Sequence, residues 1–182
     1  MNYWQGEQIE LRGIEPGDAN FFYEWNKETE TQKNLDQIWF PSSLFRQEKW
    51  VEKQSIKSIE DDSYFFVILN KAGERVGMIH TNDCDKKNGN FGYGLGIIEA
   101  HRKKGYASEA VYLVLNYYFQ ELRYHKAMVS IYAFNQASIA LHRKIGFKEE
   151  GRLREMLFGG NEFHDLLKFG LLKRELLEPQ SE

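Results

Sequence analysis

The sequence predicts an α/β (α+β) fold in which a mixed central sheet of about six to seven strands is flanked by about four helices. Three observations support this prediction. Short apolar segments joined by tight turns occupy the middle of the chain, a glycine-rich strand at 91–97 leads into a helix, and two long segments at the end flank Gly159-Gly160-Asn161. A hairpin meander followed by a strand–helix–strand–helix unit is the order expected of a mixed sheet.

The first third of the chain contains one strand and two helices by pattern. Ile9–Arg12 is a short strand candidate, and the apolar spacing from Phe21 to Trp25 predicts a first helix. A second helix is expected to begin near residues 42–43, where serines can cap it, and to run into a polar segment that ends about residue 62.

Two strands joined by a turn come next. Tyr64–Leu69 is apolar on both faces and is predicted to be a buried strand. Lys71–Glu74 has the composition of a hairpin turn, Val76–Asn82 returns as the following strand, and Asp85–Asn90 is another turn.

The strand at 91–97 alternates bulky residues with glycine. Side chains in a strand point to alternate faces, so residues 91, 93, 95 and 97 share one face and glycines 92, 94 and 96 leave the other face bare. Three glycines on one face predict either a bulge, tight packing against a helix, or a surface on which a ligand lies against the main chain.

The remaining elements follow from periodicity and turn chemistry. Apolar residues from Ala107 to Tyr118 recur at helical spacing, and Lys126–Ala133 is a strand expected to run parallel to the glycine strand, either as a neighbour or as a splayed pair. Asn135–Ile145 is predicted to be a helix that ends at Gly146. Lys148–Phe158 and Phe163–Leu172 are expected to form an antiparallel hairpin.

The helix at 135–145 shows two stripes that we expect to face different partners. Its predicted core stripe consists of Ala137, Ala140, Leu141 and Ile145, and its second stripe consists of Asn135, Ser138, Ile139 and His142.

Composition restricts the class of protein. At 182 residues and 42% apolar content, the chain is long enough to form a single domain over residues 1–182. A net charge of −3, from 27 acidic and 24 basic residues, gives no electrostatic reason to expect nucleic acid and suits a cationic substrate. The single cysteine, Cys84, supplies neither a disulfide framework nor a cysteine-based metal site, and we predict no metal. The chain opens with no leader-like segment and has no apolar run of about 18 residues, so we expect a cytoplasmic protein without membrane contact.

The turn after the glycine strand is suited to bind an anion. Arg102–Ala107 places small residues where main-chain N–H groups converge at a helix N-terminus, which is a natural phosphate site. A basic surface turn is the alternative. The turn lacks the Gly-Lys-Ser/Thr ending of a P-loop, and its spacing does not fit a dinucleotide-binding fingerprint.

Together, these segments resemble the GNAT superfamily of acetyl-CoA-dependent N-acetyltransferases over nearly the whole chain. Arg102 through Ala107 fit the family's pyrophosphate signature, and Asn135–Ser138 leading to Lys144–Phe147 is similar to its second helical motif. The ending EEGRLREMLFGGNEFHDLLKFGLL is similar to the closing hairpin of the branch that contains RimJ and RimL, which are ribosomal-protein N-terminal acetyltransferases, and spermidine acetyltransferase.

The resemblance implies a site for acetyl-CoA. It implies that the main chain of Leu95, Gly96 and Ile97 hydrogen-bonds the pantetheine arm and the thioester carbonyl, where a fixed N–H donor stabilises the oxyanion. The pyrophosphate is expected on Arg102, Lys103, Lys104, Gly105, Tyr106, Ala107 and Ser108, and Asn135 is expected to contact the cofactor.

The resemblance also suggests catalytic and acceptor-binding residues. The position seven residues after Asn135 is often a tyrosine that protonates the departing thiolate, and here it is His142. Histidine can donate a proton near neutrality, with Ser138 as a second catalytic candidate and Tyr132 or water as alternatives. Asp165 and Tyr93 are the predicted substrate-lining residues. Candidates for the base are His80, Asp83, Glu155, His164 and Asp165, none of which the sequence singles out.

We therefore expect direct acetyl transfer to a primary amine in a ternary complex, without a covalent enzyme intermediate, by a monomer or homodimer. A protein N-terminus is the first candidate acceptor, and a polyamine or other small amine is the alternative. A non-catalytic acyl-CoA-binding module remains a further alternative because of the histidine at position 142. Nucleic-acid binding through residues 101–104 is disfavoured by the acidic balance.

Overall fold

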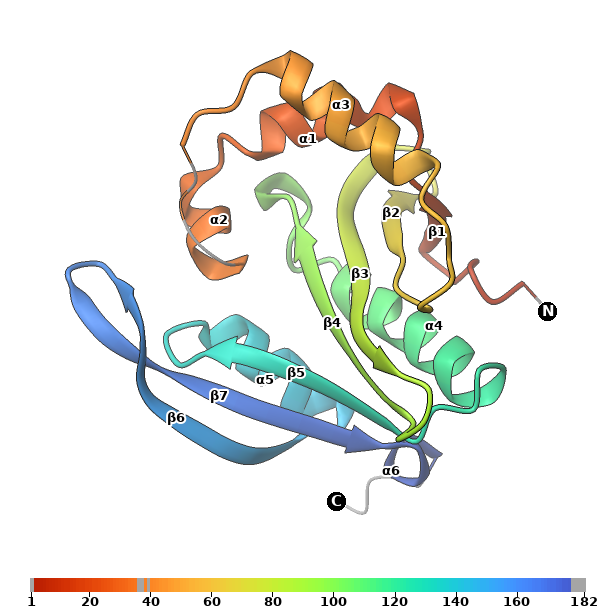
Figure 1. Cartoon of the computed structure of the whole chain (residues 1–182), viewed down its shortest axis with the longest axis vertical. Helices are drawn as coiled ribbons and strands as arrows, with labels where there is room; N and C mark the ends of the chain where they lie inside the picture. Colours follow the sequence, from red (N-terminus) through yellow and green to blue (C-terminus); the bar gives the residue numbers. More distant parts are fainter. Residues whose placement is uncertain (1, 36–37, 39, 178–182) are drawn as a thin grey trace. The chain divides into compact units, whose positions relative to one another are not determined.

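The computed structural model describes residues 2–35, 38 and 40–177. Within these residues it contains seven strands and six α-helices, and the strands form one mixed sheet in the order β1-β2-β3-β4-β5-β7-β6 (Figure 1). The predicted mixed α/β fold is confirmed. Among the described residues, no helix is both long enough and apolar enough to cross a membrane.

The chain divides into two compact units. The first comprises Met1–Asn82 with Gly94–Val114, and the second comprises Asp83–Tyr93 with Leu115–Glu182. Strands β3 and β4 and helix α4 each contribute residues to both units. That residues 1–182 act as a single domain stays a prediction.

The first unit begins with β1 (Ile9–Gly13), α1 (Ala19–Trp25), α2 (Thr29–Leu35) and α3 (Leu44–Ser55). β2 (Phe65–Asn70) pairs antiparallel with β1 and with β3 (Arg75–Asp85). The predicted second helix begins at the right place, because Ser43 caps it by accepting the Arg46 N–H at 3.1 Å. It ends at Ser55 rather than about residue 62. The short helix α2 was missed because its sequence, TETQKNL, has no apolar periodicity.

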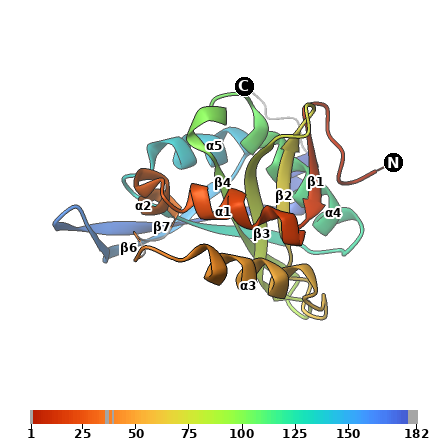
Figure 2. The same cartoon turned by 90° about the horizontal axis from the view of Figure 1, so that it is seen from above.

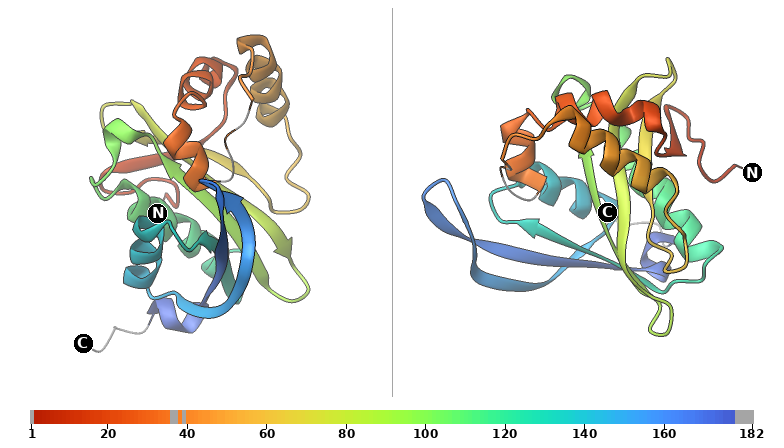
Figure 3. Two further views of the ribbon diagram at one scale, coloured as in Figure 1. Left: turned by 90° about the vertical axis from the view of Figure 1, so that its left-hand side faces the viewer. Right: turned by 45° about the horizontal axis from the view of Figure 1, so that its top comes forward.

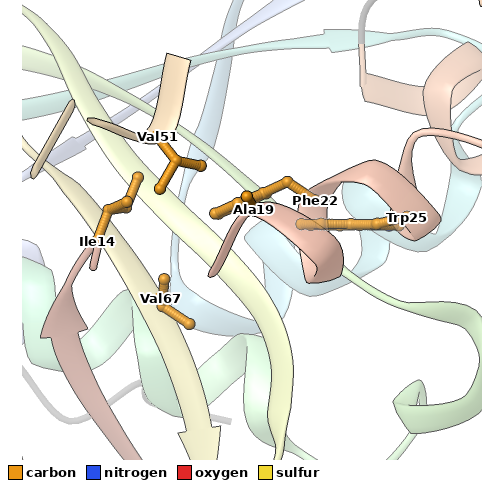
Figure 4. Close-up of a cluster of buried hydrophobic side chains, with 6 residues drawn as sticks. All are labelled: Ile14, Ala19, Phe22, Trp25, Val51 and Val67. Atoms are coloured by element: carbon orange, nitrogen blue, oxygen red, sulfur yellow. The ribbon is translucent and has the colours of Figure 1, made fainter. Parts of the chain in front are cut away.

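Helices α1 and α3 lie side by side and pack onto the strands beneath them (Figures 1 and 2). The core that they share consists of side chains from both helices, from β2 and from the segment before α1. Its buried members are Ile14, Ala19, Phe22, Trp25, Val51 and Val67 (Figure 4). This core fixes Trp25 at the end of α1.

A buried carboxylate secures the start of α1. Asp18 has no exposed surface, and it accepts hydrogen bonds from Arg12 at 2.7 and 2.8 Å, from Arg75 at 2.6 Å and from the Glu15 N–H at 2.8 Å. Burial raises the pKa of Asp18, but the hydrogen bonds from Arg12, the Glu15 N–H and Arg75 outweigh it and lower the pKa to about 2. The carboxylate is therefore charged whenever the protein is folded at ordinary pH.

The rest of the first unit leads from the sheet to a long helix. The last residues of β4 (Asn90–Ile97) belong to the first unit. They are followed by a 3₁₀ turn (Glu99–His101), the loop 102–105 and the beginning of α4 (Tyr106–Gln120). β3 is longer than predicted and reaches Asp85.

The second unit contains β5 (Lys126–Tyr132), α5 (Gln136–Ile145), β6 (Lys148–Gly159), β7 (Glu162–Leu172) and α6 (Lys173–Leu177). The predicted parallel pairing with β4 is confirmed over three residue pairs, from Asn90↔Lys126 to Gly92↔Met128. On its other edge β5 pairs antiparallel with β7. The predicted final hairpin is present, and its turn extends beyond the end of β5 (Figures 1 and 3).

Candidate functional site

In the first unit, the loop that precedes α4 is tightly bent. Lys103 has φ 62° and Gly105 has φ 85°, so both lie in the left-handed region. The first backbone hydrogen bond of α4 runs from the Glu109 N–H to the Gly105 carbonyl, at 3.1 Å. The three N–H groups before it, at residues 106–108, have no acceptor among the described residues. These are the orphan donors that a helix N-terminus offers to a phosphate.

Of the three basic side chains in this loop, one makes hydrogen bonds to neighbouring elements and two are exposed to solvent. Arg102 donates from Nε to the Ile97 carbonyl at 3.1 Å and from its terminal nitrogen to the Thr31 hydroxyl, so its guanidinium fixes the loop to β4 and α2. Lys103 and Lys104 are exposed. The predicted contribution of positive charge therefore falls mainly to these two lysines. The hydrogen bond from Arg102 also engages the Ile97 carbonyl, one of the groups predicted to meet the cofactor.

An acid in the first turn of α4, Glu109, is paired with the segment before β1. Both carboxylate oxygens of Glu109 accept the Gln8 N–H, at 3.0 and 3.2 Å. A free carboxylate would repel a phosphate at this helix end, and its engagement with the segment before β1 reduces that repulsion.

At Gly94 and Gly96 the glycine face of β4 is covered by side chains, so tight packing, one of the predicted alternatives, is what the structure shows there. A Cβ atom at Gly94 would lie 2.5 Å from the His80 ring, and one at Gly96 would lie 2.9 Å from the Trp25 ring and 3.1 Å from Leu35. Tight packing of side chains therefore explains both glycines. Leu95 and Ile97 point to the opposite face, where Leu95 is half-buried and Ile97 is buried.

In the second unit, His142 is a buried member of α5. Its Nδ1–H donates to the Ser138 carbonyl at 2.7 Å, with the Ser138 hydroxyl 3.3 Å from the same nitrogen. Because a carbonyl can only accept, the proton lies on Nδ1. Burial lowers the pKa of His142 although the hydrogen bond to Ser138 raises it, so the ring is neutral at neutral pH. Its Nε2 atom is buried and has no partner in the described part of the chain.

The imidazole of His142 belongs to a small aromatic cluster. It stacks on Tyr93 with ring centroids 5.8 Å apart and meets Phe147 edge-on at 5.2 Å. Burial raises the pKa of the Tyr93 phenol well above its usual value, and its hydroxyl is likewise buried with no partner among the described residues. Tyr93 is only 6% exposed, because its ring is packed in this cluster. Its role in lining a substrate site stays a prediction.

The predicted core stripe of α5 is right for Ile145 and wrong for its two alanines. Ile139, His142 and Ile145 are the buried side chains, whereas the predicted core residues Ala137 and Ala140 are exposed. Asn135 caps the helix, with Oδ1 accepting the Ser138 N–H at 3.1 Å, and Gly146 ends it in the left-handed conformation as predicted. Periodicity found the helix but placed its core face on the alanines.

Asp165 stabilises the β6–β7 hairpin through two hydrogen bonds. Its two oxygens accept from Arg152 and from the Glu155 N–H, both at 3.0 Å. These contacts fix an irregular stretch of β6 between Leu153 and Leu157, in which Glu155 has φ 51°. A substrate-binding role for Asp165 stays a prediction.

The base candidates differ in their surroundings. His164 is 2.9 Å from the Gly159 carbonyl through Nε2, and Glu155 and Asp83 are exposed. His80 is half-buried on β3 and stands directly against the glycine face of β4. The sequence offered one indirect signal for this contact, namely glycines on a strand next to one that carries a histidine. Trp25, which covers Gly96, lies on the first helix that the sequence predicts.

Comparisons with known proteins agree with these features. A family model described as an acetyltransferase (GNAT) domain matches residues 8–148. The SPbeta prophage-derived uncharacterized N-acetyltransferase YokL of Bacillus subtilis is 40% identical over 175 residues, which is 96% of each chain. The putative ribosomal N-acetyltransferase YdaF of the same organism is 29% identical over 173 residues, or 93% of each chain. The structure of spermidine N-acetyltransferase from Vibrio cholerae in complex with CoA and spermine superposes with a TM-score of 0.82 at 23% identity, covering 95% of this chain and all of that one.

Proposed function

The chain belongs to the GNAT family of acetyltransferases, and on that premise we propose that it transfers an acetyl group from acetyl-CoA directly to a protein N-terminus, within a ternary complex. As a member of this family it is an acyltransferase that uses acetyl-CoA as donor and an amine as acceptor. The proposal adds the acceptor, the direct mechanism, a place in the RimJ/RimL-like branch and the residues involved.

The loop 102–105 and the first turn of α4 are the proposed pyrophosphate site. The support is the run of unpaired N–H groups at residues 106–108, next to the exposed Lys103 and Lys104. Arg102 holds the loop through Ile97 and Thr31. The main chain of residues 95–97, at the end of β4 and separated from this loop by the 3₁₀ turn Glu99–His101, is the proposed site of the pantetheine arm. Asn135 is proposed to contact the cofactor from the start of α5.

Direct transfer requires that the amine nitrogen attack the thioester carbonyl, that the C–S bond break, and that the thiolate gain a proton. His142, with Ser138 beside it, is the proposed proton donor. Its Nδ1 proton is committed to the Ser138 carbonyl, so donation has to come from a proton taken up at Nε2. Burial disfavours that form, which makes Tyr132 or a water molecule the alternative donor.

One observation favours a polypeptide acceptor over a small polyamine. The segment from residue 35 to residue 59 exposes large apolar side chains, namely Leu35, Ile38, Phe40, Phe45, Ile56 and Ile59. Peptides offer apolar side chains to such a surface, and polyamines do not. The acids of α3 are exposed to solvent, and Glu52 is paired with Lys49 at 2.7 Å. A polyamine acceptor is the second candidate, favoured by the fold shared with the spermidine enzyme.

Measuring CoA release with a panel of acceptors tests the proposed function. We expect short peptides with a free N-terminus to be acetylated with a higher kcat/KM than spermidine or spermine, and mass spectrometry to place the acetyl group on the α-amine. Peptides blocked at the N-terminus are the control. Preferential turnover of spermidine would replace the proposed acceptor, and modification of blocked peptides would exclude the α-amine.

A further inference from the structure

His80 is held against the main chain of β4 in a way that only glycine permits. It lies opposite Phe65 in the β2–β3 register, and the two rings are parallel within 17° at a centroid distance of 4.9 Å. On its β4 side, a Cβ atom at Gly94 would lie 2.5 Å from Cε1 and 3.0 Å from Nε2 of the imidazole. The ring is thus fixed between an aromatic side chain and a glycine.

Two ring nitrogens among the side chains that cover Gly94 and Gly96 have no hydrogen-bond partner among the described residues. Nδ1 of His80 and Nε1 of Trp25, whose ring covers Gly96, are both buried and have no hydrogen-bond partner in the described parts of the chain. Trp25 is 6% exposed. A buried polar atom without a partner costs free energy, so such atoms point to a bound water or ligand group. His80 as a whole residue is half-buried.

This position suits one requirement of the reaction. An amine acceptor is mostly protonated at neutral pH, because an α-amine has a pKa of about 8 and a side-chain amine one of about 10. The ammonium must lose a proton before its nitrogen can attack. Burial lowers the pKa of His80, so its imidazole is neutral and has a free lone pair.

The distance along the strand is short. Gly94, on which His80 lies, directly precedes Leu95, the first of the three residues proposed to hold the pantetheine arm and thioester. Strand residues advance about 3.3 Å each, so the imidazole lies within about 10 Å of that stretch along the strand.

We propose that His80 accepts the proton that the acceptor ammonium must lose. In this step a proton moves from the ammonium to the imidazole, and the neutral amine then attacks the thioester carbonyl carbon. The C–N bond forms and the C–S bond breaks. The thiolate gains a proton from the donor proposed above, and the second proton lost by the amine nitrogen replaces it on that donor. The imidazolium returns its proton to water. This assignment rests on the proposed function, because it presupposes acetyl transfer to an amine over β4.

The test compares acceptors that do and do not need a base. One is a short peptide with an ordinary N-terminal amine, and the other is the same peptide with an aminooxyacetyl N-terminus, whose amine is already neutral at pH 7. We expect His80→Gln to reduce kcat/KM by about 100-fold for the first peptide, the usual size of a general-base contribution, and by less than about threefold for the second. His125→Gln is the matched control, since His125 is exposed in the loop before β5.

A second variant tests the geometry. Gly94→Ala places a methyl group where the His80 ring now lies, so it should reproduce the selective loss, and in a His80→Gln background it should add little further loss. Thermal unfolding and acetyl-CoA affinity, measured for every variant, show whether each one folds and binds the donor. If Gly94→Ala does not fold, the His80→Gln comparison decides alone.

Three outcomes would overturn the assignment. Equal loss with both peptides would mean that His80 only positions its neighbours, and loss with neither would mean that it takes no part. If the wild-type protein acetylates spermidine and neither peptide, the proposed acceptor is wrong, whereas the His80 assignment is still testable. His80→Gln is then compared with wild type on spermidine and on an alkoxyamine of similar size. Acetylation of no amine at all would contradict both proposals.

Discussion

At the scale of single residues, the important difference is whether a buried polar atom has a hydrogen-bond partner. Asp18 is buried and fully paired, and it holds Arg12 and Arg75 at the start of α1. His142 is buried with one nitrogen paired and the other not. Removing a partner from a buried charge destabilises the fold, whereas a buried atom without a partner is available for chemistry.

Asp18→Asn is expected to lower the free energy of unfolding by about 2 kcal/mol at pH 7, because it removes the charge that Arg12 and Arg75 bind. The folded pKa of about 2 lies below the ordinary value of 3.8, so this stabilisation is fully present above about pH 4 and is lost as the pH falls through about 2. Urea unfolding at several pH values measures it.

The control for this prediction is Glu24→Gln, which breaks the exposed pair with Lys27 and should change stability little. A difference between Asp18→Asn and wild type that persisted unchanged at pH 2 would show that the effect is not electrostatic.

His142→Phe should lower kcat much more than it weakens acetyl-CoA binding. The phenyl ring fits the aromatic cluster with Tyr93 and Phe147, so the fold should survive while the nitrogen at the Nε2 position is lost. Steady-state kinetics and calorimetry measure the two effects. Equal losses of kcat and affinity would instead assign His142 a binding role.

At the scale of elements, turns and helix ends place the groups that act. The loop between β4 and α4 is bent by Lys103 and Gly105, both with positive φ, and this bend brings the first N–H groups of α4 together. In the β6–β7 hairpin, Asp165 secures an irregular stretch through Arg152 and Glu155. The same kind of local geometry therefore builds the loop proposed to bind pyrophosphate in one unit and a structural bend in the other.

Gly105→Ala is expected to weaken acetyl-CoA binding by about tenfold or more, because Ala at φ 85° is strained and relaxation of the loop misdirects its N–H groups. Gly73→Ala is the matched control, since Gly73 has φ 76° in the β2–β3 turn. Both variants should lose similar stability in thermal unfolding. If the two bound acetyl-CoA equally well, the loop 102–105 would not be the pyrophosphate site.

At the scale of the whole molecule, the family model covers most of the chain that forms the seven-stranded sheet. The match of the acetyltransferase (GNAT) family model to residues 8–148 spans elements of both units, and β3, β4 and α4 run through both. Ligand binding to the native state should therefore be visible in the unfolding of the chain as a whole. Whether the protein is a monomer or a homodimer stays a prediction.

Acetyl-CoA at 100 times its Kd is expected to raise the free energy of unfolding by about 2.7 kcal/mol, because only the folded protein binds it. Pantetheine at the same concentration, which lacks the pyrophosphate, should stabilise much less. Denaturant titrations with and without each compound measure the difference. Equal stabilisation by the two would contradict a dominant role for the pyrophosphate loop.

Much of the fold and part of the site could be predicted because their signals are local. Alternation and turn residues placed β2, β3, β4 and β5, and serine at 43 marked the start of α3. The spacing from Arg102 to Ala107 placed a turn before α4, and its binding of an anion stays a prediction. Helix α2 escaped prediction because a polar helix has no apolar period. The acetyltransferase assignment followed from motifs in their order along the chain, and it is confirmed.

The sequence by itself determined the strands, most of the helices, the family and the left-handed glycine that ends α5, since backbone preference depends on a residue and its immediate neighbours. Only the tertiary structure decided which face of α5 is buried, that Asp165 secures a bend, and that His80 and Trp25 cover Gly94 and Gly96. The physical reason is that burial and pairing depend on side chains from distant segments, whose approach no local pattern records.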